Sequence, residues 1–159
     1  MILASHSDAA YFNETCARSR AGLHIFCSDN DPIPCNNGPV LSLAQIINVV
    51  LSSASEAELS GLFVTSKATV PLRQTLEEIK RPQPRYPIQM DESTANAFAN
   101  ETIVPKKIES MDMRFYWFQC RDSQGQFRYY WAPGTTNRVD YHTKRYPPQY
   151  HELYRPWSS

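Results

Sequence analysis

The sequence has no excess of charge of either sign. Its 16 basic and 16 acidic side chains cancel at neutral pH, whereas many proteins that bind polyanions carry a strong positive field over a whole face. The neutral balance argues against high-affinity binding to nucleic acid by charge alone. Any attraction of that kind must come from local patches of cations.

The cysteines lack the spacing of a zinc site. The chain has four of them, with no Cys-x-x-Cys pair and no histidine at zinc-ligand spacing. Four cysteines are enough for two disulfides, but the chain is not dense in cysteine and polar residues soon follow Met1, Ile2 and Leu3, which is unlike a secretory signal. We therefore expect scattered thiols and an intracellular location.

Long apolar runs and internal repeats are also missing. The longest nearly apolar stretch, residues 43–51, contains Gln45 and Asn48 and is far shorter than the roughly 20 residues of a membrane helix. We expect no membrane association. A length of 159 residues with 42% hydrophobic side chains suits one domain with a real core. We place that domain at residues 1–150, followed by an irregular tail at 151–159 at the end of an aromatic, proline-rich stretch from Tyr146.

Apolar patterning predicts several strands early in the chain and alternating elements later. Residues 1–8, 21–27, 86–90 and 126–131 have the pattern of strands, and residues 28–38 that of a loop. Residues 40–49 are predicted as a strand, with a helix as the alternative. The order of strands and helices predicts an α/β fold with a mixed sheet and helices on its faces.

Helix signals follow the third predicted strand. Ser53 and Glu56 fit a capping box, and so do Ser55 and Glu58 two residues later. Pro71 interrupts the run and predicts a kink or a second helix. Further helices are expected at 93–100 and at 108–118, where Ile108, Met111, Phe115 and Phe118 recur at helical spacing and predict a core-facing stripe.

Four acidic residues stand in contexts that suit an active centre. Asp8 closes the first predicted strand, Asp91 follows the strand at 86–90, and Glu58 lies near the start of a helix. Taken alone, each of them, and Asp140 as well, is more often a solvated surface charge. Two magnesium ions about 3.5–4 Å apart, however, need several carboxylates from different elements, so the four together suggest a two-metal nuclease.

Glu56 and Glu58 cannot both belong to such a centre. Two residues along a helix correspond to a rotation of about 200°, so the two side chains face different directions. Both also have a capping role available to them. Periodicity alone leaves the choice open.

Several sequence blocks resemble the ribonuclease H domain that ends the polyprotein of copia-type retrotransposons. They follow one another in the order found in that family and span residues 1 to about 150. The blocks are 7–11 (Ser-Asp-Ala-Ala-Tyr), 17–22 (Ala-Arg-Ser-Arg-Ala-Gly), 52–58 (Ser-Ser-Ala-Ser-Glu-Ala-Glu), 111–117 (Met-Asp-Met-Arg-Phe-Tyr-Trp) and 131–137 (Trp-Ala-Pro-Gly-Thr-Thr-Asn), which continues into 140–144 (Asp-Tyr-His-Thr-Lys).

The resemblance implies a fold and an activity. The fold is ribonuclease-H-like, three-layered, with a mixed five-stranded sheet whose first three strands are antiparallel and with helices on both faces. The activity is hydrolysis of the RNA strand of an RNA–DNA hybrid, in a cytoplasmic particle or the nucleus. The implied partners are the hybrid and a reverse transcriptase domain upstream in the polyprotein, and the domain itself is expected to be monomeric.

The resemblance also assigns residues. The catalytic residues and ligands of two Mg²⁺ ions, or of Mn²⁺, are Asp8, Glu58, Asp91 and Asp140. Glu58 is chosen over Glu56 because the family's glutamate precedes an apolar residue and then a small one, here Leu59 and Gly61. Apart from the resemblance, Arg18, Arg20, Lys106 and Lys107 are candidate phosphate contacts from their charge, although each alone is more often an ordinary surface cation. Asn137 is a further expected substrate contact.

Two positions depart from the related pattern. Glu92 follows Asp91 where many relatives have asparagine, and Thr135 stands where cellular ribonucleases H carry a histidine. The missing histidine predicts slower turnover. The alternative function is a decayed or repurposed interaction module without catalysis. An integrase or transposase nuclease is disfavoured, because the Pro-Gly-x-x-Asn-x-x-Asp ending resembles the ribonuclease H branch.

Overall fold

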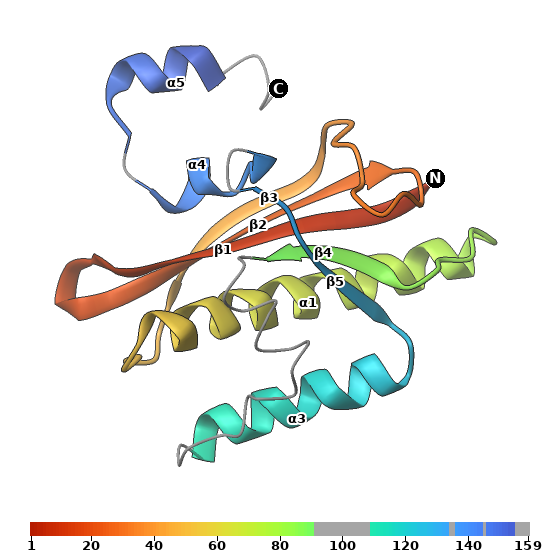
Figure 1. Cartoon of the computed structure of the whole chain (residues 1–159), viewed down its shortest axis with the longest axis horizontal. Coiled ribbons are helices and arrows are strands. Elements are labelled where there is room, and N and C mark those ends of the chain that lie inside the picture. The colour runs from red at the N-terminus through yellow and green to blue at the C-terminus, as the bar shows by residue number, and fades with distance from the viewer. Residues whose placement is uncertain (91–108, 134–135, 145, 155–159) are drawn as a thin grey trace.

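The computed structural model describes residues 1–90, 109–133, 136–144 and 146–154. Strands and helices alternate after an initial run of three strands (Figure 1). In chain order the elements are β1 (Ile2–Glu14), η1 (Thr15–Ala17), β2 (Arg18–Ser28), β3 (Pro39–Ile47), α1 (Ala54–Glu78), β4 (Tyr86–Met90), α3 (Glu109–Ser123), β5 (Phe127–Trp131), α4 (Asp140–Thr143) and α5 (Pro148–Tyr154).

The five strands form one mixed sheet in the order β3-β2-β1-β4-β5. The β1–β2 and β2–β3 pairs are antiparallel, and β4 pairs in parallel with both β1 and β5. The predicted sheet with three antiparallel strands first is therefore confirmed. In this register Asp8 of β1 lies opposite Gly22 of β2.

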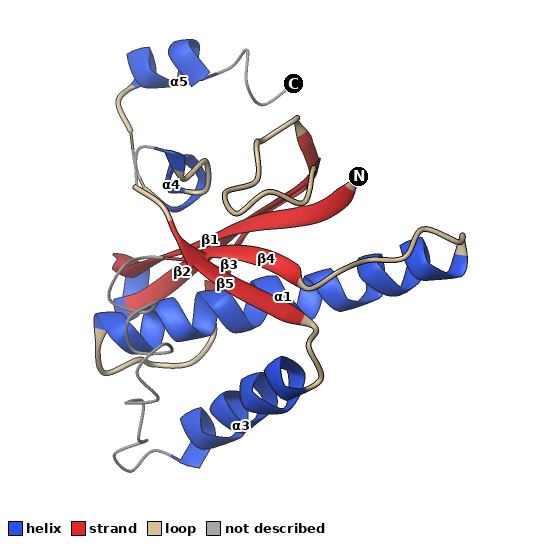
Figure 2. Cartoon of the chain, turned by 45° about the vertical axis from the view of Figure 1, so that its right-hand side comes forward, coloured by secondary structure: helices blue, strands red, loops and turns tan. Residues whose placement is uncertain are grey.

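Helices cover both faces of the sheet. In Figures 1 and 2, α1 and α3 lie on one side, while α4 and α5 lie on the other. α1 packs on β1 and β2, and α4 touches the same two strands. This arrangement gives the three layers that were expected.

The first helix begins as its sequence predicts. The Ser53 hydroxyl accepts a hydrogen bond from the Glu56 backbone N–H at 3.2 Å, as an N-cap does. The Glu56 carboxylate in turn accepts hydrogen bonds from the backbone N–H and the hydroxyl of Ser52, both at 2.7 Å. The helix then continues through Pro71 to Glu78, so the prediction of a second helix at Pro71 is wrong.

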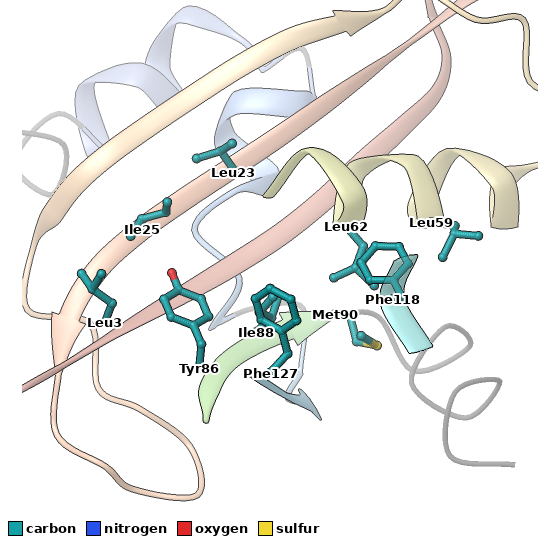
Figure 3. Packing of buried hydrophobic residues seen from close by; sticks show 10 residues of the cluster. All are labelled: Leu3, Leu23, Ile25, Leu59, Leu62, Tyr86, Ile88, Met90, Phe118 and Phe127. Atoms are coloured by element: carbon teal, nitrogen blue, oxygen red, sulfur yellow. The ribbon is translucent and has the colours of Figure 1, made fainter. Parts of the chain in front are cut away.

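The main core lies between the sheet and the helices α1 and α3 (Figure 3). Phe118 of α3 is fully buried there, which confirms one member of the predicted apolar stripe; the side chains of Ile108, Met111 and Phe115 lie outside the described part. The cluster consists of Leu3, Leu23, Ile25, Leu59, Leu62, Tyr86, Ile88, Met90, Phe118 and Phe127.

Several boundaries differ from the predictions. β1 continues to Glu14 because its pairing with β2 runs on beyond Asp8 to the Glu14–Arg18 pair, so Asp8 is inside the strand and not at its end. Residues 40–49 contain a strand, which rules out the helix alternative. α5 covers 148–154, partly where an irregular tail was expected. The helix predicted at 93–100 lies outside the described residues. Throughout the described ranges, no helix is long and apolar enough to cross a membrane.

Candidate active site

The side chain of Asp8 is on the sheet face opposite α1. Its neighbour Ser7 faces α1, since the Ser7 hydroxyl accepts a hydrogen bond from Thr65 at 3.1 Å. Side chains alternate between the two faces of a strand, so His6 and Asp8 both project toward the α4 side. Asp8 is half-buried there.

Gly22 allows α4 to approach this face closely. A Cβ atom at Gly22 would lie 2.5 Å from the Cγ1 of Val139 and 2.5 Å from the Cγ2 of Thr143, which is closer than real carbon atoms pack. Gly22 is the residue opposite Asp8 in the sheet. The missing side chain therefore lets the helical turn that begins at Asp140 lie directly beside Asp8.

Contacts between Asp8 and α4 are direct. The Thr143 hydroxyl donates a hydrogen bond to the Asp8 carboxylate. The Lys144 ammonium forms an ion pair with the Asp140 carboxylate at 2.8 Å. The structure thus brings two of the four predicted acids, Asp8 and Asp140, to one place from opposite ends of the chain.

The carboxylates of Asp8 and Asp140 repel each other because they carry like charge. Burial raises the pKa of the Asp8 carboxyl, and the nearby Asp140 carboxylate raises it further. The hydrogen bond from Thr143 and the positive charge of Lys144 act in the opposite direction. A cation bound between the carboxylates would relieve their repulsion.

Segment 137–139 is tied to β1 by hydrogen bonds. The Asn137 side-chain amide donates to the Ser7 carbonyl at 3.2 Å, and its oxygen accepts from the Val139 N–H at 3.0 Å. The Arg138 N–H donates to His6 Nδ1 at 3.3 Å. Asn137, predicted as a substrate contact, therefore uses both ends of its amide inside the protein.

His6 is buried and neutral. Burial lowers its pKa to about 3, and the charges of His24 and Arg138 add to the effect. A neutral ring leaves Nδ1 free to accept the Arg138 N–H, so His6 positions the segment that carries Asp140. His6 showed no metal-ligand spacing in the sequence, and this role depends on a contact that spans almost the whole chain.

Glu58 is in the first turns of α1, close to where that helix crosses β1. Gly61, three residues later and on the same side of the helix, packs so closely that a Cβ there would be 3.0 Å from the Asp8 carbonyl oxygen. Glu58 is half-buried. Glu56 is held in the cap, which supports the choice of Glu58, but participation of Glu58 in the site stays a prediction.

Other predicted residues are placed less directly. Asp91 follows β4, which pairs with β1 through His6 and Gln89, but it lies outside the described residues. So do Lys106, Lys107 and both departures from the family pattern, Glu92 and Thr135.

The two arginines predicted to contact substrate have protein partners. Arg20 pairs with Glu14 at 2.7 Å. The Arg18 side chain donates to the Thr15 carbonyl at 3.2 Å. Both therefore stiffen the β1–β2 hairpin, and their contact with substrate stays a prediction.

The carboxylate pair suits a hard divalent cation. Asp8 and Asp140 offer oxygen ligands, as Mg²⁺ requires. Within the described ranges, however, no group of three His, Cys, Asp or Glu side chains is arranged to hold a metal ion. A two-metal centre therefore needs further carboxylates, and Glu58 and Asp91 are the candidates.

Known proteins resemble this chain in structure and not in sequence. No protein-family model matches it, and no curated protein matches it significantly. The N-terminal RNase H domain of Rv2228c from Mycobacterium tuberculosis is 16% identical with a TM-score of 0.59, over 89% of each chain. RNase H1 from the archaeon Halobacterium salinarum is 14% identical with a TM-score of 0.56, over 89% of this chain and 94% of that one.

A third similar structure is that of LC11-RNase H1, isolated from compost by a metagenomic approach. In its complex with an RNA/DNA hybrid it is 11% identical with a TM-score of 0.54, over 88% of this chain and 92% of that one. These likenesses establish the ribonuclease-H-like fold. At identities of 11% to 16% they show the fold alone.

Proposed function

We propose that this chain hydrolyses the RNA strand of RNA–DNA hybrids by a two-metal mechanism, as the ribonuclease H domain of a copia-type retrotransposon polyprotein with a reverse transcriptase domain upstream. The observation that carries the proposal is the meeting of Asp8 and Asp140 across the close approach at Gly22. The ribonuclease-H-like fold and the hybrid bound by LC11-RNase H1 support the same substrate.

In this proposal the chain's residues hold and shape the site. Asp8 and Asp140, joined by Glu58 and Asp91, provide the carboxylates, and Thr143 fixes the orientation of Asp8. Divalent cations held by these carboxylates would supply a water of lowered pKa and stabilise the charge on the leaving 3′ oxygen. Sequence is not read, because recognition of a hybrid relies on ribose hydroxyls and backbone shape.

A specific contact favours a second candidate, an interaction module without cleavage. Lys144 already neutralises Asp140 at 2.8 Å, and the hydrogen bond and charge of Asp140 raise the pKa of Lys144 even though burial opposes this. The Lys144 ammonium thus compensates part of the negative charge that a divalent ion would otherwise compensate. Such a protein would bind hybrid and leave it intact.

Cleavage of end-labelled RNA in a hybrid, with Mg²⁺ or Mn²⁺ present, separates the two candidates. We expect cutting by the wild type and a loss of at least about 100-fold in Asp8→Asn and Asp140→Asn, because the loss of a metal ligand removes several kcal/mol of transition-state stabilisation. Asp29→Asn, at an exposed acid in the loop after β2, serves as the matched control and should cut normally.

Uncut RNA with well-folded wild type in both metals would reject the catalytic proposal. Binding of the uncut hybrid in the same samples would then favour the interaction module. If Asp29→Asn lost as much activity as Asp8→Asn, the effect would come from net charge and not from the site.

A further inference from the structure

β3 is an open edge of the sheet. It pairs with β2 on one side and stands at the end of the strand order, as Figure 1 shows. No described strand pairs with its other side. An edge strand presents a row of N–H and C=O groups on which a further strand can pair.

The edge has little of the protection that natural sheets use. β3, Pro-Val-Leu-Ser-Leu-Ala-Gln-Ile-Ile, contains no charged residue, and its only proline is the first residue. Charged side chains, lysine above all, are the common safeguard against pairing by other chains. Instead, apolar side chains are exposed in and just after the strand: Val40 by 50%, Leu43 by 39%, Val49 by 40% and Val50 by 76%.

A hollow of about 540 Å³ lies beside this edge, between β3 and α1. We call it the β3 groove. Among the described residues its walls are mostly apolar, and two cations but no carboxylate line it. Its lining includes Leu43, Phe63, Val64, Lys67 and Arg114.

The two cations differ in how they are held. Arg114 is positioned by a hydrogen bond from its guanidinium to the Ser60 hydroxyl at 2.6 Å and lies 5.6 Å from the centre of the Phe63 ring. Lys67 is exposed. Within the described residues neither has a carboxylate partner. In the part of the chain that the structure describes, the groove therefore combines apolar walls with two positive charges that have no carboxylate partner.

We propose that β3 receives an extended segment of a partner protein as an additional strand, with apolar side chains and one acidic side chain facing the β3 groove. The backbone of the segment pairs with the open edge. Its apolar residues pack on Leu43, Phe63 and Val64, and its carboxylate meets Lys67 and Arg114. A second copy of this chain fits less well, since it would bring an uncharged β3 and the same two cations.

Synthetic peptides titrated against the full chain test this inference. The probe is a short fluorescent peptide of alternating valine and threonine with a central glutamate, and binding is followed by anisotropy at low salt. A second peptide has lysine in place of the glutamate, and a third has alternate backbone nitrogens methylated. We expect saturable binding of the first and affinity at least about tenfold weaker for the other two, because charge and backbone pairing both contribute.

Two matched variants locate the binding site. Lys67→Glu should weaken the binding of the glutamate peptide and strengthen the binding of the lysine peptide, because it reverses the charge at residue 67 on the groove wall. Arg81→Glu, a change of the same charge at an exposed residue just beyond α1, should bind like the wild type. Hybrid cleavage by Lys67→Glu is expected to stay normal, so failure of this inference is distinguishable from failure of the proposed function.

Several results would overturn the proposal. The first is equal affinity for the three peptides, and the second is peptide binding that Lys67→Glu does not change. The third is self-association of the chain through β3, seen by light scattering, without peptide binding. The fourth is displacement of the bound peptide by RNA–DNA hybrid. The third would assign the edge to a second copy, and the fourth would assign it to nucleic acid.

Discussion

The hydroxyl of Thr143, the last residue of α4, donates a hydrogen bond to the carboxylate of Asp8 inside β1. This bond lowers the pKa of Asp8, against the larger effect of burial, which raises it. The contact thus helps to keep Asp8 ionised and fixes the direction of its oxygens. A ligand of a divalent cation needs both properties.

Thr143→Val tests the electrostatic part of this contact. Valine keeps the buried shape of threonine but cannot donate the bond, so the pKa of Asp8 should rise further. The acid limb of the cleavage profile should then move to higher pH, with a rate on that limb lower by about tenfold, as expected for a lost charge-assisted hydrogen bond. Thr143→Ser should keep the wild-type profile. Identical acid limbs for valine and serine would contradict the assignment.

Gly22→Ala tests the close approach of α4. The new Cβ would meet Val139 and Thr143 at 2.5 Å, so α4 must move away from β2. We expect a loss of about 1–3 kcal/mol in the free energy of unfolding and a much larger relative loss of hybrid cleavage. Urea denaturation and the labelled-hybrid assay measure the two effects.

Gly38→Ala is the comparison for that variant. Gly38 has a φ of +103°, and a Cβ added there would have no neighbouring atom within 4 Å, so alanine strains the backbone without displacing a neighbour. It should lower stability by roughly 1 kcal/mol and leave cleavage unchanged. If both glycine variants lost activity in proportion to stability, the special role of Gly22 would be rejected.

Asp8→Asn should separate stability from function. The asparagine oxygen can still accept the Thr143 hydrogen bond, while the repulsion with Asp140 disappears. Without metal the variant should unfold at the same temperature as the wild type or at a higher one. Mg²⁺ should raise the melting temperature of the wild type and not that of the variant, because only the intact site binds the ion. An equal magnesium shift in both proteins would place the ion elsewhere.

His6 should make the fold sensitive to acid. Its pKa is about 3 in the folded chain against an ordinary value of 6.5, so between these values the unfolded chain binds the additional proton. The contribution of the neutral His6 ring to the free energy of unfolding is therefore complete above pH 6.5. It decreases by roughly 1 kcal/mol for each pH unit below that value. Urea denaturation of the wild type at pH 7 and pH 5 measures this slope.

His6→Gln isolates the contribution of that ring. Glutamine cannot take up the proton, so the variant should lose less stability between pH 7 and pH 5 than the wild type. Asp8 acts in the opposite direction, since its raised pKa lets the folded chain bind the additional proton in acid. Equal slopes for wild type and His6→Gln would show that His6 is not the source.

Local signals predict much of the fold. The period-two pattern at 126–131 is reflected in β5, and the Ser53–Glu56 signal marks the start of α1. The same kind of signal ends β1 too early, because the continuation to Glu14 depends on pairing with β2. The strand propensity of residues 1–14 does not indicate the pairing with β2.

The candidate site is predictable only in part. The resemblance points to Asp8 and Asp140, and the structure brings these two together. The resemblance does not assign the contributions of Thr143 and Lys144. These residues nevertheless follow Asp140 by three and four positions, the spacing at which helical side chains are neighbours. The role of His6 has no local signal, because it arises only where segment 137–139 docks on β1.

The long separation along the chain between Asp8 and Thr143 has a consequence for folding. Contacts between such remote residues form late, because closing the intervening loop is entropically unfavourable until other structure is in place. The sheet and α1 can assemble before the turn that begins at Asp140 docks beside Gly22. Under the proposed function, a partly folded chain lacks the complete pair of Asp8 and Asp140, and cleavage requires that the turn beginning at Asp140 has already docked on the sheet.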